Sequence, residues 1–148
     1  MKITVETVVN ADLNRVWEAW NNPTDITQWN SAQADWHTTR SSVDLREGGK
    51  FLSRMEAKDG SAGFDFEGTY TRIVPRRAIE YRMSDGREVT VEFAERAGGV
   101  LVAETFDAET ENTPEMQRAG WQAILENFRR HVEAKSAAGS EALTGSRH

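Results

Sequence analysis

The stretch TPEMQRAGWQAILENFRRHVEAK, residues 113–135, decides the fold, because it is the longest amphipathic segment of the chain. Its large apolar side chains recur at steps of three and four and so share one helical face: Trp121, Ile124, Leu125, Phe128 and Val132. Thr113 is suited to cap the helix, and Pro114 to its first position, where the missing N–H costs nothing. A helix with such a face needs an apolar partner surface.

The chain before this helix supplies that surface mainly as strands. Residues 2–9 alternate in polarity, which predicts a first strand. Two short helices are expected next, the first with Leu13, Val16, Trp17 and Trp20 along one side, the second over residues 24–29 with Ile26 and Trp29 inward. Residues 33–40 are ambiguous and favour an irregular or short strand.

From Val43 onward, alternating segments are separated by hairpin signals at Gly48-Gly49, Asp59-Gly60, Asp85-Gly86 and Gly98-Gly99. Phe64, Phe66, Gly68 and Tyr70 share a face, but Ile73 breaks this parity and predicts a bulge. Such hairpins predict one antiparallel sheet of about six to seven strands, whose apolar face the C-terminal helix covers. The fold class is α+β. Within the helix, Gly120 indicates a close approach to the sheet.

Length and composition indicate a single domain over residues 1–135, followed by a flexible tail over residues 136–148 that is rich in Gly, Ser and Ala. No apolar run approaches the roughly 18 residues of a membrane span, so no membrane insertion is expected. The first ten residues alternate in polarity and lack a signal-peptide core, which favours a cytoplasmic protein. The net charge of −6 argues against nucleic-acid binding.

The segments VWEAWNNPTDITQW, DLREGGKF, FEGTYTRIVP, AIEYRMSDG, VTVEF and GWQAILENFRRHVE occur in an order that resembles the START-like, or SRPBCC, superfamily. Within it, the sequence is similar to the branch named after the activator of the heat-shock protein 90 ATPase. The resemblance covers nearly all of residues 3–135. It implies a helix-grip fold, in which a curved sheet wraps around the terminal helix, with two short helices after the first strand.

The resemblance also implies a cavity between sheet and helix that, in many members, holds an apolar or aromatic small molecule. Members include lipid carriers, hormone receptors, polyketide cyclases and domains that assist a chaperone, so the fold alone does not select a function. The chaperone relationship implies a chaperone partner and a role in the stress response as a further alternative.

Few residues of the chain suggest catalysis. His37, His131 and His148 are scattered, and no phosphate-binding glycine loop occurs, so neither a metal nor a cofactor is expected. His131 and His148 are interpreted as surface residues. Asp35 and His37 would share a face of a strand and, with Tyr81, are the weak candidates for proton transfer, although a half-exposed His37 without a catalytic role is the favoured interpretation.

Two glutamates lie within predicted strands. Alternation turns Glu67 outward, whereas Glu104 shares parity with Val100, Val102 and Phe106, which leaves its orientation open. An inward glutamate would have a raised pKa and could act as an acid or base. Parity also sends Arg54 and Arg82 outward, toward solvent.

The aromatic residues carry the stronger signal, with five tryptophans, six phenylalanines and two tyrosines mostly at inward parity. The candidate ligand-binding residues are Trp20, Trp29, Trp36, Phe51, Met55, Phe66, Tyr81, Met83, Phe93, Trp121 and Leu125. The N-terminal half of the long helix is expected to form a wall of the cavity, and its C-terminal half, around Phe128 and Val132, to be plain core.

The function expected first is non-enzymatic binding of a small hydrophobic or aromatic ligand, lipids included. The alternatives are an enzyme of the polyketide cyclase, dehydratase or hydrolase kind that uses the same cavity, and a chaperone ATPase activator. Edge strands of such a sheet could pair, so a homodimer is also considered.

Overall fold

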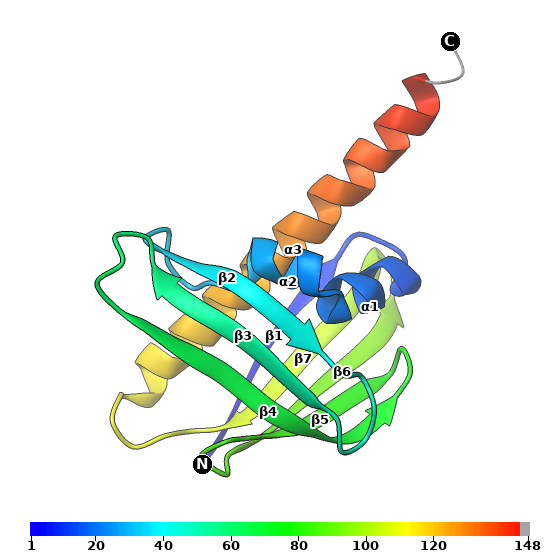
Figure 1. Cartoon of the computed structure of the whole chain (residues 1–148). Helices are drawn as coiled ribbons and strands as arrows, with labels where there is room; N and C mark the ends of the chain where they lie inside the picture. The colour runs from blue at the N-terminus through cyan, green and yellow to red at the C-terminus, as the bar shows by residue number, and fades with distance from the viewer. Residues whose placement is uncertain (146–148) are drawn as a thin grey trace.

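Seven antiparallel strands form one curled sheet, and a long helix lies against its concave side (Figure 1). The computed structural model describes the backbone of residues 1–145 and the side chains of residues 1–136. The strands are β1 (Lys2–Val9), β2 (Trp36–Val43), β3 (Lys50–Ala57), β4 (Gly63–Val74), β5 (Ala78–Met83), β6 (Glu88–Arg96) and β7 (Gly99–Asp107). The helices are α1 (Leu13–Asn21), α2 (Pro23–Trp29) and α3 (Pro114–Gly145). The α+β helix-grip architecture expected from the sequence is confirmed.

The strand order is β1-β7-β6-β5-β4-β3-β2, so every strand after α2 pairs with its neighbour in sequence and β1 closes on β7. The turns fall where the glycine pairs predicted them. At the β6–β7 turn, Gly99 has φ +143°, and a Cβ there would lie 2.0 Å from the Val9 carbonyl oxygen, so only glycine fits. The predicted bulge is also confirmed, since the β4–β5 register shifts between Tyr70 and Arg72.

Strand β2 is more regular than the sequence indicated. It runs without a break from Trp36 to Val43 and pairs with β3, with one register shift between Thr38 and Arg40. Strand β2 tolerates a polar residue at the inward position 38, because the Thr38 hydroxyl donates to the carbonyl of Asn30 at 2.6 Å. A polar residue thus occupies a buried position without losing its hydrogen bond.

Helices α1 and α2 close one end of the sheet. The side chains of Asp12 and Asn22 cap their N-termini, and Pro23 begins α2. The indole N–H of Trp29 donates to the Ala19 carbonyl at 3.0 Å, which fixes α2 on α1. Trp20 and Trp29 each meet Phe128 of α3 edge-on, at 4.9 Å between ring centroids. This aromatic cluster joins the three helices.

Helix α3 begins as predicted, with Pro114 first and the Thr113 hydroxyl accepting the backbone N–H of Met116 at 3.1 Å. Leu125, Phe128 and Val132 are fully buried core residues. The helix continues to Gly145, ten residues past Lys135, where the sequence pattern ended it. The flexibility expected of residues 136–148 stays a prediction, and the placement of His148 lies outside the described residues.

Two details of α3 correct the sequence interpretation. A Cβ added at Gly120 would meet nothing within 4 Å, so this glycine does not serve a close approach to the sheet. His131 is not a plain surface residue either. Its Nε2 lies 2.9 Å from the carboxylate of Asp25, which is 3% exposed and also accepts from Lys135 Nζ at 2.8 Å. This ion cluster around the buried Asp25 ties α2 to α3, and it could not be predicted from sequence neighbours because Asp25 lies 106 residues from His131 and 110 from Lys135.

Helix α3 is fastened to one side of the sheet. Arg118 donates to the Thr4 carbonyl and Gln122 to the Glu6 carbonyl, while the backbone N–H of Asn10 donates to Glu133. These bonds hold α3 along β1, one edge of the sheet. Because the helix lies on that side, the concave surface of the β2–β5 half remains partly uncovered.

Candidate functional site

A cavity of about 270 Å³ lies between α3 and the concave face of the sheet. Strands β2 to β5 form most of its floor, while Trp121 and Ile124 of α3 form a wall. Phe64 lines it and is 50% exposed, so this end of the cavity reaches the surface. The complete lining is Trp20, Ile26, Trp29, Asn30, Ser41, Val43, Phe51, Ser53, Met55, Phe64, Phe66, Tyr70, Ile79, Tyr81, Arg87, Glu104, Trp121 and Ile124.

Most of the candidate ligand-binding residues line this cavity: Trp20, Trp29, Phe51, Met55, Phe66, Tyr81 and Trp121. Four others lie elsewhere. Met83, Phe93 and Leu125 are buried in the core, and Trp36 packs its ring on Phe64 at 5.9 Å between centroids. Alternation identifies the inward face of each strand, but it does not separate the packed part of that face from the part that borders a cavity.

The floor of the cavity is a cluster of aromatic rings centred on Phe51. Its ring centroid lies 5.4 Å from that of Tyr70, 5.7 Å from Phe66 and 4.8 Å from Tyr81. Gly68, paired with Phe51 across the strands, makes room for this ring, since a Cβ there would lie 2.9 Å from it. Above, Trp121 stacks on Phe106 with ring centroids 4.0 Å apart and planes 9° from parallel.

Small polar side chains create much of the empty space. Ser53 occupies the inward position between Phe51 and Met55 on β3, and it is 4% exposed. Its hydroxyl lies 3.4 Å from that of Ser41 on β2. A serine at an inward position among large apolar residues is a sequence signal for a cavity, because it leaves the volume of a larger side chain unfilled.

Glu104 settles the orientation that the sequence left open: it faces the cavity. It pairs with Val91 on one side and Val5 on the other, and only 5% of its surface is exposed. No hydrogen bond reaches its carboxyl group from the residues whose side chains are described. Burial therefore raises the pKa of Glu104 from 4.5 to about 8. The shared parity with Val102 and Phe106 was the signal for this placement.

Three more titratable groups line the cavity, namely Tyr70, Tyr81 and Arg87. Burial raises the pKa of Tyr81 well above its ordinary value, and the negative charge of Glu104 adds to this effect. Burial likewise raises the pKa of Tyr70. Both phenols are therefore neutral hydrogen-bonding groups. Arg87 is already engaged, because its Nε donates to Asp85 at 2.8 Å.

The other candidates for proton transfer do not join Tyr81. His37 and Asp35 are exposed, neither lines the cavity, and no hydrogen bond joins their side chains. Among the residues whose side chains are described, no group of three or more His, Asp or Glu could hold a metal ion. Of the three candidates for proton transfer, only Tyr81 lines the cavity, together with Glu104, whose orientation the sequence left open.

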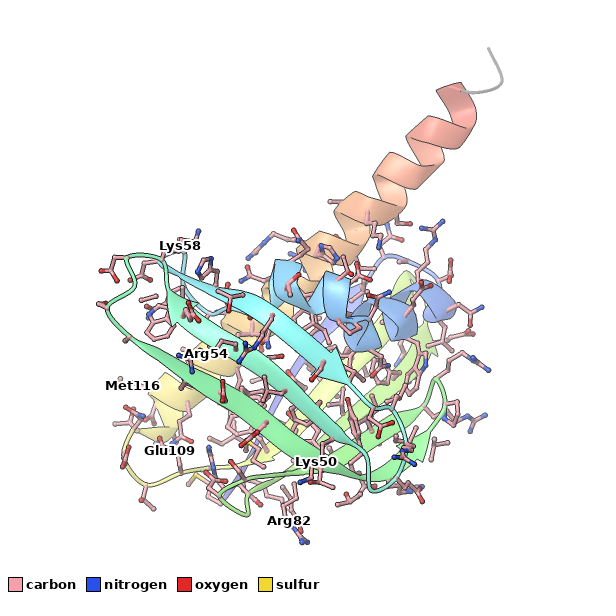
Figure 2. The ribbon with its side chains drawn as sticks, in the orientation of Figure 1. Lys50, Arg54, Lys58, Arg82, Glu109 and Met116 are labelled. Carbon is pink, nitrogen blue, oxygen red and sulfur yellow. The ribbon has the colours of Figure 1, made fainter. Side chains whose placement is uncertain are left out.

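The outward-facing residues agree with their parity. Glu67 is exposed on β4, and Arg82 projects from the molecule and pairs with Glu88 at 3.0 Å (Figure 2). Arg54 pairs with Glu56 and Asp65 on the outer face. Met116 projects from the first turn of α3 and is 62% exposed, so the cavity wall of this helix begins only at Trp121 (Figure 2). In the part of the chain that is described, no helix is long and apolar enough to cross a membrane.

Several solved structures share the fold of this chain. Its fold matches the solution structure of an AHSA1-like protein of Aeromonas hydrophila with a TM-score of 0.86 and 56% sequence identity, over 91% of this chain and 94% of the other. A protein of Cytophaga hutchinsonii matches with a TM-score of 0.79 and 42% identity, over 90% and 93% of the two chains. A protein of Nitrosomonas europaea, 17% identical, shares the fold with a TM-score of 0.77 over 91% and 96% of the two chains.

No curated protein matches the chain. The sequence profile of the Activator of Hsp90 ATPase homolog 1-like proteins, by contrast, matches residues 10–133, which include α1, all strands from β2 to β7 and most of α3 up to Glu133. Together with the relative from Aeromonas hydrophila, this match confirms the resemblance that the sequence segments indicated. The chain belongs to the family of Activator of Hsp90 ATPase homolog 1-like proteins.

Proposed function

We propose that this protein binds a small, largely apolar aromatic molecule in the cavity beneath Trp121. The observation that carries the proposal is the volume of about 270 Å³ enclosed by aromatic side chains on the floor and on the α3 wall. A cavity of about 150 Å³ lined by apolar residues accepts benzene, so this one suits a ligand of one or two rings. Ligand sites are commonly concave, mainly apolar and equipped with a few polar groups, as here.

Indole is a suitable first probe, because it is a flat two-ring molecule with one N–H donor. We expect it to bind to the wild-type protein with a Kd of about 1 mM or lower, measured by calorimetry or by NMR titration. The amide signals that shift should belong to β3, β5 and the Trp121 turn of α3. No binding of indole by the wild-type protein would overturn the proposal.

Substitution Ser53→Phe tests the position of the site. Ser53 points into the cavity, so the added ring should fill it and abolish indole binding, at a cost of about 1–3 kcal/mol for overpacking. Ser42→Phe is the matched control, because Ser42 is exposed on the adjacent strand β2. If Ser53→Phe fails to fold, Ser41→Phe introduces the same ring from β2. Undiminished indole binding in a folded, cavity-filled variant would contradict the proposed site.

Asp35 and His37 do not support the enzyme alternative, because both are exposed and neither lines the cavity, which leaves Glu104 and Tyr81 as the cavity groups that an enzyme would have to use. The chaperone alternative stays a prediction that the family name motivates. Co-purification with an Hsp90-type chaperone, followed by measurement of its ATPase rate, would test it. The homodimer also stays a prediction, and the edge strand β2 is where pairing would occur.

A further inference from the structure

The carboxyl group of Glu104 is the one acidic side chain among the residues that line the cavity. The residue is only 5% exposed, and its carboxyl group receives no hydrogen bond from any group that the structure describes, so the carboxyl oxygens border the cavity. A buried carboxyl group without a partner costs free energy of folding. Its neighbours at the same parity, Val102 and Phe106, are apolar and fully buried, so Glu104 is the polar exception on this face of β7.

We propose that the ligand is an aromatic amine, bound with its rings among the cavity aromatics and its protonated nitrogen donating to the carboxylate of Glu104. The inference rests on the proposed function, since it names the chemical class of the molecule that the cavity takes. An ammonium group would supply the partner that Glu104 lacks, in the form of charge-assisted N–H···O bonds.

The surroundings of Glu104 suit a cation better than an anion. Phe106, two residues after Glu104 on the same face of β7, stacks with Trp121. The charge of Glu104 also affects the pKa of Tyr81, whose ring lines the same cavity. Ring faces of Trp and Tyr attract cations, which adds to the pairing with the carboxylate. The net charge of −6 also favours the approach of a cation from solution.

Arg87 is the only cation among the described residues that line the cavity, and it makes no hydrogen bond or ion pair with Glu104. Arg87 lies just before β6, where its Nε donates to the carboxylate of Asp85 and its Nη1 donates to the Asp107 carbonyl. Val91, the β6 partner of Glu104, lies four residues further on, about 13 Å along the strand. Arg87 therefore remains with its own partners, and the Glu104 end of the cavity is left for a ligand cation.

Binding of such a ligand should release a proton. The other titratable groups that line the cavity are Tyr81 from β5, Tyr70 from β4 and Arg87 just before β6, whereas the β1 partner of Glu104 is the apolar Val5 and α3 contributes only Trp121 and Ile124. Neither tyrosine changes charge near pH 7, because burial raises the pKa of both. Glu104, whose pKa is about 8, is largely protonated at pH 7 and must lose its proton to pair with an ammonium group.

The experiment compares three probes that share the indole ring: tryptamine, which is cationic at pH 7, neutral tryptophol and anionic indoleacetate. Calorimetry with the wild-type protein should give tryptamine the highest affinity, by about tenfold or more over tryptophol. Titration in two buffers of different ionisation enthalpy should show release of close to one proton per tryptamine, and none with tryptophol. The affinity for tryptamine should also rise between pH 6 and pH 8.

Glu104→Gln is the variant that isolates the carboxylate. It should reduce the affinity for tryptamine about ten- to hundredfold, remove the proton release and leave the binding of tryptophol and indole little changed. Glu67→Gln, an exposed glutamate on β4, is the control and should behave as the wild type.

The outcomes separate the two proposals. If indole fails to bind to the wild-type protein, the binding function itself is wrong. If indole binds but tryptophol or indoleacetate binds as tightly as tryptamine, or if Glu104→Gln leaves tryptamine affinity unchanged, the cavity binds aromatics and the amine assignment is overturned.

Discussion

Replacement of Glu104 by glutamine should remove the largest expected fall in the stability of this protein between pH 5 and pH 9. Glu104 is the buried carboxyl group that faces the cavity from β7, and burial raises its pKa from 4.5 to about 8. Between those values the folded protein keeps the proton and the unfolded chain releases it. Because the folded state binds more protons in this range, the free energy of unfolding falls as the pH rises.

The size of the effect follows from these two pKa values. Each pH unit between them costs about 1.4 kcal/mol, so the loss reaches about 3 kcal/mol at pH 7 and about 5 kcal/mol above pH 8. The contribution of the raised Glu104 pKa to the free energy of unfolding is fully present below pH 4.5 and is lost above pH 8. A domain with a typical free energy of unfolding of about 5–15 kcal/mol should show such a loss clearly.

Urea unfolding of the wild type and Glu104→Gln at pH 5, 7 and 9 measures the effect. The glutamine has its own burial cost, so the quantity compared is the change of the free energy of unfolding with pH, not its value at one pH. The carboxyl groups whose pKa is lowered by ion pairs and hydrogen bonds, such as Asp25 and Asp107, titrate below pH 5 and do not enter the difference. Glu67→Gln, on the exposed face of β4, should retain the pH dependence of the wild type.

A wild type and Glu104→Gln with parallel stability curves would refute the reasoning. It would mean that the carboxyl group is hydrated or paired in solution. Addition of saturating tryptamine gives a second check, since a ligand that binds only the folded, ionised form raises stability more at pH 9 than at pH 5.

Other substitutions test the packing of α3, with urea or thermal unfolding as the measurement in each case. Gly120→Ala should raise the free energy of unfolding by about 0.5–1 kcal/mol, because the added Cβ meets nothing and alanine favours the helix; a loss would show that the space is not open. Asp25→Asn should cost about 1.5–3 kcal/mol, whereas Lys135→Met should cost less than about 1 kcal/mol, since the side chain of Lys135 is 61% exposed; the reverse order would contradict the ion cluster. Gln117→Ala should cost about 1–3 kcal/mol, because the buried amide bonds to both backbone groups of Glu109 and to the Asn112 carbonyl; a neutral effect would contradict its role in holding the loop before α3.

Local chemistry predicted the frame of this molecule from short stretches of sequence. Gly-Gly and Asp-Gly pairs marked four of the five hairpin turns, including the β6–β7 turn, because glycine readily adopts a positive φ such as that of Gly99. The β4–β5 turn has no glycine and places Arg76 at φ +62°. The parity break at Ile73 marked the bulge of β4, and Thr113-Pro114 marked the start of α3. Each of these signals depends on neighbours within a few residues, so the sequence contains it in full.

The tertiary structure decided what each inward residue does. Alternation assigned Phe51, Met83 and Phe93 equally to the apolar face, yet only Phe51 borders the cavity. The difference arises because α3 is fastened along β1, through bonds such as that of Arg118 to the Thr4 carbonyl, and leaves the β2–β5 half partly uncovered. No local pattern encodes which edge of a sheet a distant helix will cover.

The difference between local pattern and tertiary packing also applies to Glu104 and His131. The sequence by itself determined that an aromatic face and a long amphipathic helix would meet, because periodicity is a local property. Only the packed structure decided that Glu104 is enclosed without a partner and that His131 reaches Asp25, 106 residues away in the chain. Burial and pairing depend on every element that surrounds a side chain, and these elements come from distant parts of the sequence.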